Sequence, residues 1–177
     1  GNGIGVTGVA PYAGLAGLRI DFYYQTTQMF VDATLYHSSG SNTNIKVKNH
    51  SYGYGVPYVL TTSEENALIS SANAGTVHCV AAGNGRGSTA QDSNTMDLQN
   101  SPHCICVAAL GSDGRYASYS SFGACVAVTA PSSSGTGYGI TTTDRTGSAG
   151  YNSGYGDTFP DLAYTSIFGG TSSASPT

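Results

Sequence analysis

The stretch Gly170-Thr171-Ser172-Ser173-Ala174-Ser175-Pro176 is the most informative part of this chain. A turn of small residues presents one hydroxyl, that of Ser172, and a helix-compatible run begins directly after it. Glycine lets the backbone bend sharply before the serine, and the start of a helix favours negative charge that develops beside it. Strings of Ser, Thr and Gly also form plain surface loops, but this layout suits a serine nucleophile.

Further segments place glycine and small polar residues at the ends of apolar runs. They read NGIGVTGVAP (2–11), NHSYG (49–53), AAGNG (81–85), and YSSFG (119–123) followed by VAVTAP (126–131). Together with GTSSASP they resemble, in order and spacing, the motifs of the subtilases, the subtilisin-like serine proteases. Several motifs in a fixed order are far more specific than any one alone. The resemblance spans nearly the whole chain.

The resemblance implies a role for most of these residues. Ser172 would attack the scissile carbonyl, and the Asn84 side chain would stabilise the oxyanion with the Ser172 backbone N–H. The cleft strand would pair with an extended peptide or protein substrate, and a second segment would form the primary specificity pocket. These substrate-binding residues are Ser51, Tyr52 and Gly53 in the strand, and Ala81, Ala82 and Gly83 in the pocket. Asn between two glycines is also a common turn residue.

The general base is harder to place. The four histidines are His37, His50, His78 and His103, and none stands in the family's histidine motif. The resemblance places the catalytic His and Asp before the loop that opens this sequence. We therefore expect residues 1–177 to be a partial peptidase S8 catalytic domain, truncated at both ends and inactive alone. His50 adjoins Ser51, so a substitute Ser–His pair is conceivable, but a cleft or packing role is favoured.

Two alternatives to a serine endopeptidase remain open. A pseudoprotease would keep the fold as a binding module for extended peptides. An esterase of the α/β-hydrolase class would carry G-x-S-x-G around its nucleophile, which Ser172 lacks. The loop 85–101 and the run 140–144 have some kexin/furin-like character. The cleft stretch 51–57 carries no carboxylate, however, so selection of dibasic sites is doubtful.

The chemistry itself requires no cofactor, but a structural metal is expected. By resemblance, calcium would be held by the Asn2 side chain and the backbone carbonyls of Ile4 and Val6, which are the oxygen ligands that calcium prefers. The alternative is a plain glycine loop. A charged ligand would have to come from outside this sequence.

The amino-acid composition limits the classes of binding partner and the cellular location that we expect. Only 9% of residues are charged and the net charge is −4, which argues against nucleic acid and anionic membranes. No apolar run approaches the ~20 residues needed to cross a bilayer. We expect a secreted or extracytoplasmic monomer. Cys79, Cys104, Cys106 and Cys125 are read as small buried hydrophobes, although Cys79 or Cys125 could pair across strands with Cys104 or Cys106.

Alternating strands and helices predict a three-layer α/β fold with a mostly parallel central sheet and helices on both faces. Helices are expected at 28–37 and at 62–75, the latter opened by a capping box at Thr62–Glu65. Gly147–Pro160 reads as a long surface loop. The two lysines of 45–49 are interpreted as a solvated or sheet-end face rather than a ligand site. Expected strands lie at 15–20, 45–49, 77–82, 105–110, 126–130, 140–143 and 164–168.

Overall fold

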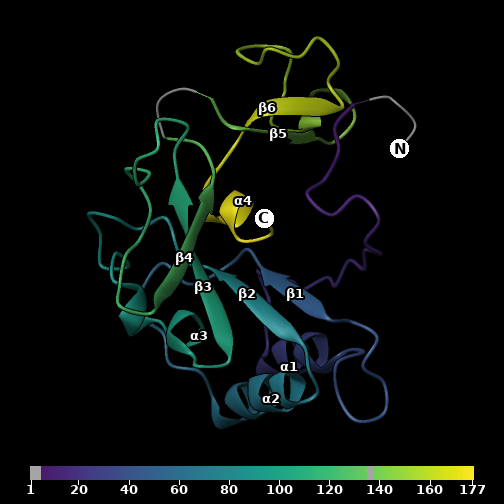
Figure 1. Ribbon diagram of the computed structural model, residues 1–177, viewed down its shortest axis with the longest axis vertical. Helices are drawn as coiled ribbons and strands as arrows, with labels where there is room; N and C mark the ends of the chain where they lie inside the picture. Colours follow the sequence, from purple (N-terminus) through teal and green to yellow (C-terminus); the bar gives the residue numbers. More distant parts are fainter. Residues whose placement is uncertain (1–4, 135–137) are drawn as a thin grey trace.

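A four-stranded parallel sheet forms the centre of the computed structural model, which describes residues 5–134 and 138–177. Its strands lie side by side in chain order (Figure 1). They are β1 (Val47–His50), β2 (Val77–Ala81), β3 (Cys104–Leu110) and β4 (Val126–Pro131). Each of the three neighbouring pairs is parallel. The α/β class with a mostly parallel sheet is therefore confirmed.

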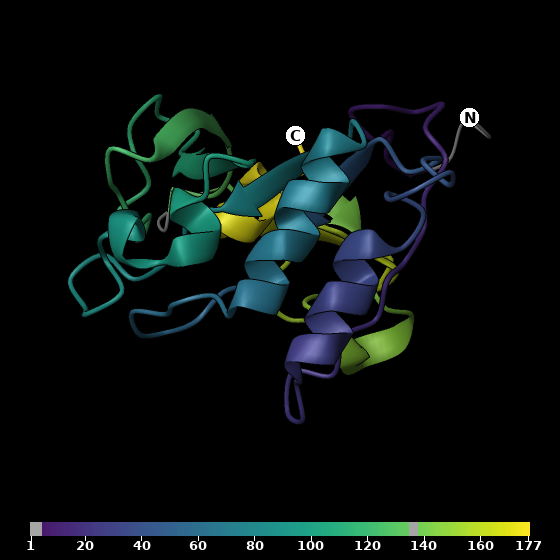
Figure 2. The same cartoon turned by 90° about the horizontal axis from the view of Figure 1, so that it is seen from below.

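Helices cover both faces of this sheet. The longer two, α1 (Thr27–Leu35) and α2 (Thr62–Asn73), pack side by side over one face, whereas α4 (Thr171–Ala174) lies on the other (Figure 2). The short α3 (Asp97–Asn100) contacts β2 and β3. Two 3-10 turns, η1 (Ser93–Thr95) and η2 (Gly147–Ala149), complete the helical elements of the described residues.

Alternation along β3 divides the core between these layers, because successive side chains of a strand point to opposite faces. On the face of α1 and α2, Phe30, Leu68, Val80 and Leu98 form a buried cluster against which Cys104 packs. A second cluster gathers around α4 and contains Val107, Ala109, Ala117 and Ala174. The small residues let α4 approach the sheet closely, which brings the serine turn to its carboxyl end.

An antiparallel pair leads into the serine turn. β5 (Ile140–Thr143) pairs with β6 (Tyr164–Phe168), and the chain runs from β6 directly into α4. The strands expected at 140–143 and 164–168 are both present, and the loop expected at Gly147–Pro160 lies between them. Asn152 holds this loop from within, because its buried amide donates to the carbonyls of Phe159 and Tyr164.

Three local predictions were wrong. Residues 15–20 form no strand, and Leu15 is 97% exposed, because no neighbouring strand pairs with this segment in the described structure. The capping box of α2 begins one residue earlier, with Thr61 and Glu64 exchanging the bonds. Lys48 is buried rather than solvated; its ammonium donates to the carbonyls of Thr34 and Tyr36 at the end of α1.

The four cysteines are free thiols. Cys106 is fully buried in a small cluster with Ala82 and Ala108, against which Cys125 packs. Burial raises the pKa of both the Cys106 and the Cys125 thiol. In the structure, the Cys106 and Cys125 side chains pack as small apolar groups.

Candidate active site

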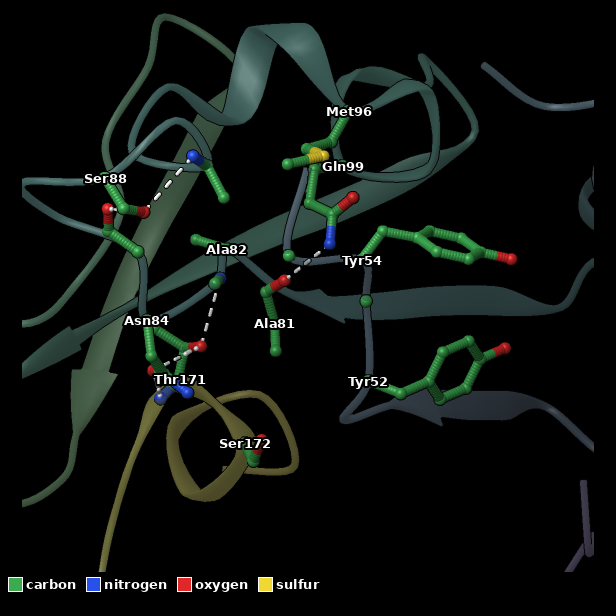
Figure 3. A pocket seen from close by; sticks show the side chains of 15 residues that line it. Tyr52, Tyr54, Ala81, Ala82, Asn84, Ser88, Met96, Gln99, Thr171 and Ser172 are labelled. Atoms are coloured by element: carbon green, nitrogen blue, oxygen red, sulfur yellow. Dashed lines mark hydrogen bonds between the residues drawn. The ribbon is translucent and has the colours of Figure 1, made fainter. Parts of the chain in front are cut away.

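One pocket brings together most of the residues singled out in the sequence. It has a volume of about 320 Å³ and lies where β2 ends, between the segment after β1 and the start of α4 (Figure 3). All predicted cleft residues except Ser51 line it, together with Ser172 and Asn84. The lining is completed by Tyr54, Gly55, Gly85, Ser88, Ala90, Met96, Gln99 and Thr171. Carboxyl ends of parallel strands are where α/β sheets bind ligands.

The serine turn depends on Gly170. Its backbone has φ +81° and ψ 166°, a conformation that essentially only glycine adopts. A Cβ at this position would lie 3.2 Å from Asn84 Nδ2. Both backbone groups of Gly170 are held: its N–H donates to the Tyr119 hydroxyl at 3.2 Å, and its carbonyl accepts from Ser132 Oγ at 2.8 Å. The turn before Ser172 is thus fixed by side chains from the β4 region.

Asn84 is oriented by Thr171, the residue before the serine (Figure 3). Asn84 Oδ1 accepts from Thr171 N at 2.8 Å and from Thr171 Oγ1 at 3.1 Å. Thr171 Oγ1 in turn accepts from Gly83 N at 3.0 Å. Because the amide oxygen is occupied twice, the Nδ2 group is turned to the opposite side. Among the described residues no acceptor binds Nδ2, so it remains available as a donor.

Ser51 joins the cleft strand to the serine turn. Its Oγ donates to the Ser172 carbonyl at 2.7 Å, and Ser172 Oγ donates to the Ser51 carbonyl at 3.3 Å. Asn49 supports this contact, because its amide donates to Ser51 Oγ at 2.8 Å and its oxygen accepts from Ser175 Oγ. Ser51 therefore holds the two sides of the site together, although it does not line the pocket itself.

Two residues at the far end of the pocket from Ser172 were missed in the sequence (Figure 3). Met96 and Gln99 are both buried, and Gln99 Nε2 donates to the Ala81 carbonyl at 3.0 Å. They come from the segment around α3, within the loop 85–101, where the kexin/furin-like character noted above singled out neither residue. No residue lining the pocket is charged. The arrangement can therefore receive an uncharged side chain, with the carbonyl next to it facing Ser172 and Asn84.

His50 faces away from this pocket. Its Nδ1 lies 2.7 Å from the Tyr52 hydroxyl and its Nε2 lies 2.9 Å from His78 Nδ1, so both ring nitrogens are engaged. Burial, with help from His78 and Lys48, lowers the pKa of His50 to about 3. Burial also lowers the pKa of His78 to about 4, with Lys48 and His103 adding to it. In the described structure no histidine is hydrogen-bonded to Ser51 or Ser172 at a side chain.

Of the three predicted metal ligands, the structure describes Val6. Asn2 and Ile4 lie outside the described residues, and Val6 belongs to the exposed N-terminal segment. Across residues 5–134 and 138–177, no three His, Cys, Asp or Glu side chains are grouped closely enough to hold a metal ion. Nor does the described part contain a helix long and apolar enough to cross a membrane.

A serine at the carboxyl edge of a parallel sheet, with an amide donor and a cleft beside it, is an arrangement that serine hydrolases use. The comparisons make the class specific. The sequence profile of the subtilase family, peptidase S8, matches residues 1–177. The chain belongs to the subtilase family.

Named relatives agree with this assignment. Over 107 residues the chain is 43% identical to a calcium-dependent protease of Trichormus variabilis, a match covering 58% of this chain and 15% of that protein. A serine protease of Aeromonas sobria superposes with a TM-score of 0.81 at 25% identity, covering 99% of this chain and 36% of the other. A protease of Pseudoalteromonas arctica superposes with a TM-score of 0.71 at 26% identity, covering 99% of this chain and 51% of the other. The chain thus spans about half or less of the length of these relatives.

Proposed function

We propose that this chain carries the nucleophile, the oxyanion site and the substrate cleft of a serine endopeptidase. The single observation that carries the proposal is how Asn84 is held next to the residue before Ser172. Thr171 holds the Asn84 oxygen, which leaves the Nδ2 donor free in the pocket that Ser172 also lines. An amide donor with no other task, next to a serine in a cleft, is what acyl transfer requires.

In the proposed reaction, Ser172 Oγ attacks the scissile carbonyl carbon. The developing oxyanion accepts hydrogen bonds from Asn84 Nδ2 and from the Ser172 backbone N–H, and water later hydrolyses the acyl-enzyme. Ser172 Oγ donates to the Ser51 carbonyl over a long 3.3 Å contact in this structure. A base would have to take that proton instead.

The base is part of the proposal and is not His50. Both His50 ring nitrogens are already bound inside the protein. The family resemblance assigns the base to a histidine and its orientation to an aspartate, both before residue 1 of this sequence. If those groups are missing from the full-length protein, the same cleft would serve as a peptide-binding module, which is the second candidate function.

The pocket supports a preference for uncharged side chains. Its far end is made by Met96, Gln99 and the backbone of Ala81, and no lining residue carries a charge. A lysine or arginine side chain buried here would lose water without gaining a counter-charge, which is unfavourable. We propose that the protein cleaves after neutral residues.

Covalent labelling tests the catalytic proposal. The full-length protein is treated with a fluorophosphonate, and the modified residue is mapped by mass spectrometry. We expect a single adduct on Ser172 that is lost in Ser172→Ala, with a fall in kcat on the order of 10⁶-fold. Ser70→Ala, which removes an exposed hydroxyl on α2, is the matched control and should label normally. Labelling that persists in Ser172→Ala would show that another residue is the nucleophile.

Calcium is proposed as a structural ion rather than a catalytic one. The relative in Trichormus variabilis is named a calcium-dependent protease. In this chain the ligands would be neutral oxygens of Asn2, Ile4 and Val6, which suit calcium in kind. Of these three residues, the structure describes Val6. We expect a chelator to lower the melting temperature of the full-length protein, and an unchanged melting temperature would contradict this.

A further inference from the structure

A continuous chain of buried hydrogen bonds runs from the pocket to the end of α1. Tyr52 supplies the hydroxyl at the pocket end, and a backbone carbonyl closes the other end. The Tyr52 hydroxyl lies 2.7 Å from His50 Nδ1, and His50 Nε2 lies 2.9 Å from His78 Nδ1. His78 Nε2 lies 2.9 Å from Ser71 Oγ, which lies 3.0 Å from Ser38 Oγ. Ser38 Oγ donates to the Thr34 carbonyl at 2.6 Å. From His50 onward every residue of this chain is at most 4% exposed.

The carbonyl at the end of the chain fixes the direction of every bond. A carbonyl only accepts, so Ser38 must use its one proton on Thr34. Ser38 Oγ then accepts from Ser71, whose own oxygen must accept from His78 Nε2–H. Burial lowers the pKa of His78, so the ring is neutral at pH 7 and its Nδ1 is the acceptor for His50 Nε2–H.

The same reasoning gives the direction of the hydrogen bond between His50 and Tyr52, which lines the pocket. With its proton on Nε2, His50 Nδ1 can only accept, so the Tyr52 hydroxyl must donate to it. Both imidazoles are neutral and both are Nε2–H tautomers. The lowered pKa of each histidine agrees with neutral rings. One interior carbonyl thereby sets the orientation of a side chain whose residue lines the substrate pocket.

The segment that this chain holds is also anchored at Ser51, which bonds Ser172, and at Tyr54, which stacks on Tyr58. Residues 51–54 follow β1 without belonging to a strand, and Gly53 and Tyr54 are exposed. The Tyr52 ring turns away from Asn84 and Ser172 toward the interior (Figure 3), where it packs on the core cluster and on Phe22. Its hydroxyl bond is the directional contact in that packing.

We propose that His50 and His78 are positioning residues, which act through the Tyr52 hydroxyl to hold the Tyr52–Gly53 backbone in the form that receives an extended peptide. The inference rests on the proposed function, because the bound molecule is the substrate of that site. A cleft strand held in place before binding loses less conformational freedom when the peptide pairs with it. Buried polar networks of this kind specify one arrangement when all their members are satisfied.

The first test needs no change within the chain of hydrogen bonds. Full-length protein carrying Ser172→Ala, which prevents turnover, is labelled with ¹⁵N-histidine, and the imidazole nitrogens are observed by NMR at pH 7. We expect His50 and His78 to be neutral with the proton on Nε2. A proton on Nδ1, or a charged ring, would overturn the proposal. The readout does not depend on catalysis, so it stands whether or not fluorophosphonate labels Ser172.

The second test removes the hydrogen bond between the Tyr52 hydroxyl and His50 Nδ1. Tyr52→Phe in the same background should move the His50 Nδ1 resonance and weaken binding of a fluorescent Ala-Ala-Ala-Leu-Ala-Ala peptide about fivefold, the worth of one net hydrogen bond. In protein with Ser172 intact, KM should rise while kcat is kept. Tyr155→Phe is the matched control, because its side chain is exposed and lies outside both the pocket and the hydrogen-bond chain. A His50 resonance that stays in place in Tyr52→Phe, a Kd within twofold, or an equal change in Tyr155→Phe would refute the role.

Discussion

The two sides of the pocket are built in different ways. On the Ser172 side, Gly170, Thr171 and Asn84 are joined by short contacts whose partners all belong to recognisable motifs. On the Tyr52 side, the cleft segment is held by a hydrogen-bond chain that begins at His50 within the 49–53 motif but continues through His78, Ser71 and Ser38, which belong to no motif. Motifs therefore encode the reacting groups, whereas tertiary packing particular to this chain encodes the surface on which a peptide would lie.

The largest effect is expected on the Ser172 side, at Asn84. Asn84→Asp keeps an oxygen that can accept from Thr171 but removes the Nδ2 donor. We expect kcat of the full-length protein to fall about 10²–10³-fold with KM little changed. Steady-state kinetics on a neutral peptide substrate measures this directly.

Asn84→Ala separates orientation from donation. It should lower kcat to a similar degree and also lower the melting temperature, because the buried Thr171 hydroxyl loses its acceptor. If Asn84→Asp retained full kcat, the donor role would be excluded and Asn84 would be a structural partner of Thr171 alone.

On the Tyr52 side, the sharper test is how the free energy of unfolding depends on pH in the acidic range. Burial lowers the pKa of His50 to about 3 and that of His78 to about 4, with Lys48 and His103 as the charged or titratable neighbours. The unfolded chain takes up these protons near pH 6.5, before the folded protein does. Their contribution to stability is thus complete above about pH 6.5 and declines as the pH falls toward 4.

Denaturant unfolding between pH 7 and pH 4.5 measures this decline. Each histidine should contribute up to about 1.4 kcal/mol per pH unit. His37→Asn is the matched control, since His37 lies outside the chain and asparagine tolerates its φ of 47°. A free energy of unfolding that stayed constant below pH 6.5 would contradict buried neutral histidines.

These two sides also mark what the sequence could predict. The parallel sheet and the strand-end placement of Ser172 and Asn84 were predictable, because local turns and apolar runs indicate them. The place of Ala81 and Gly83 in the same pocket was predictable only from the family resemblance. The burial of Lys48 was not, since it depends on the end of α1 packing over β1. His50 and His78 meet only because β1 and β2 pair in one register, which no local pattern specifies.

A smaller effect is expected from Gly170→Ala. The φ of +81° is strained for any residue with a Cβ, and such strain is worth about 1–3 kcal/mol. Gly156→Ala is the matched control, because Gly156 has the same φ of +81° but open space where the methyl group would lie. Both variants should melt earlier, but only Gly170→Ala should lose activity, since its methyl meets the Asn84 amide. Equal activity in the two would show that the contact is unimportant.

The smallest effect is expected at the far end of the pocket, where neither motif nor hydrogen-bond chain dictates the residue. Gln99→Glu places a carboxylate in a lining that has no charge. Cleavage after Arg or Lys relative to Leu should increase about fivefold, the worth of one partly solvated ion pair. Gln99→Leu removes the same bond to the Ala81 carbonyl without adding charge, so its selection should stay neutral. A peptide-library profile compares the two. Strong basic selection by the unsubstituted protein would instead mean that a carboxylate from outside the described residues reaches this pocket.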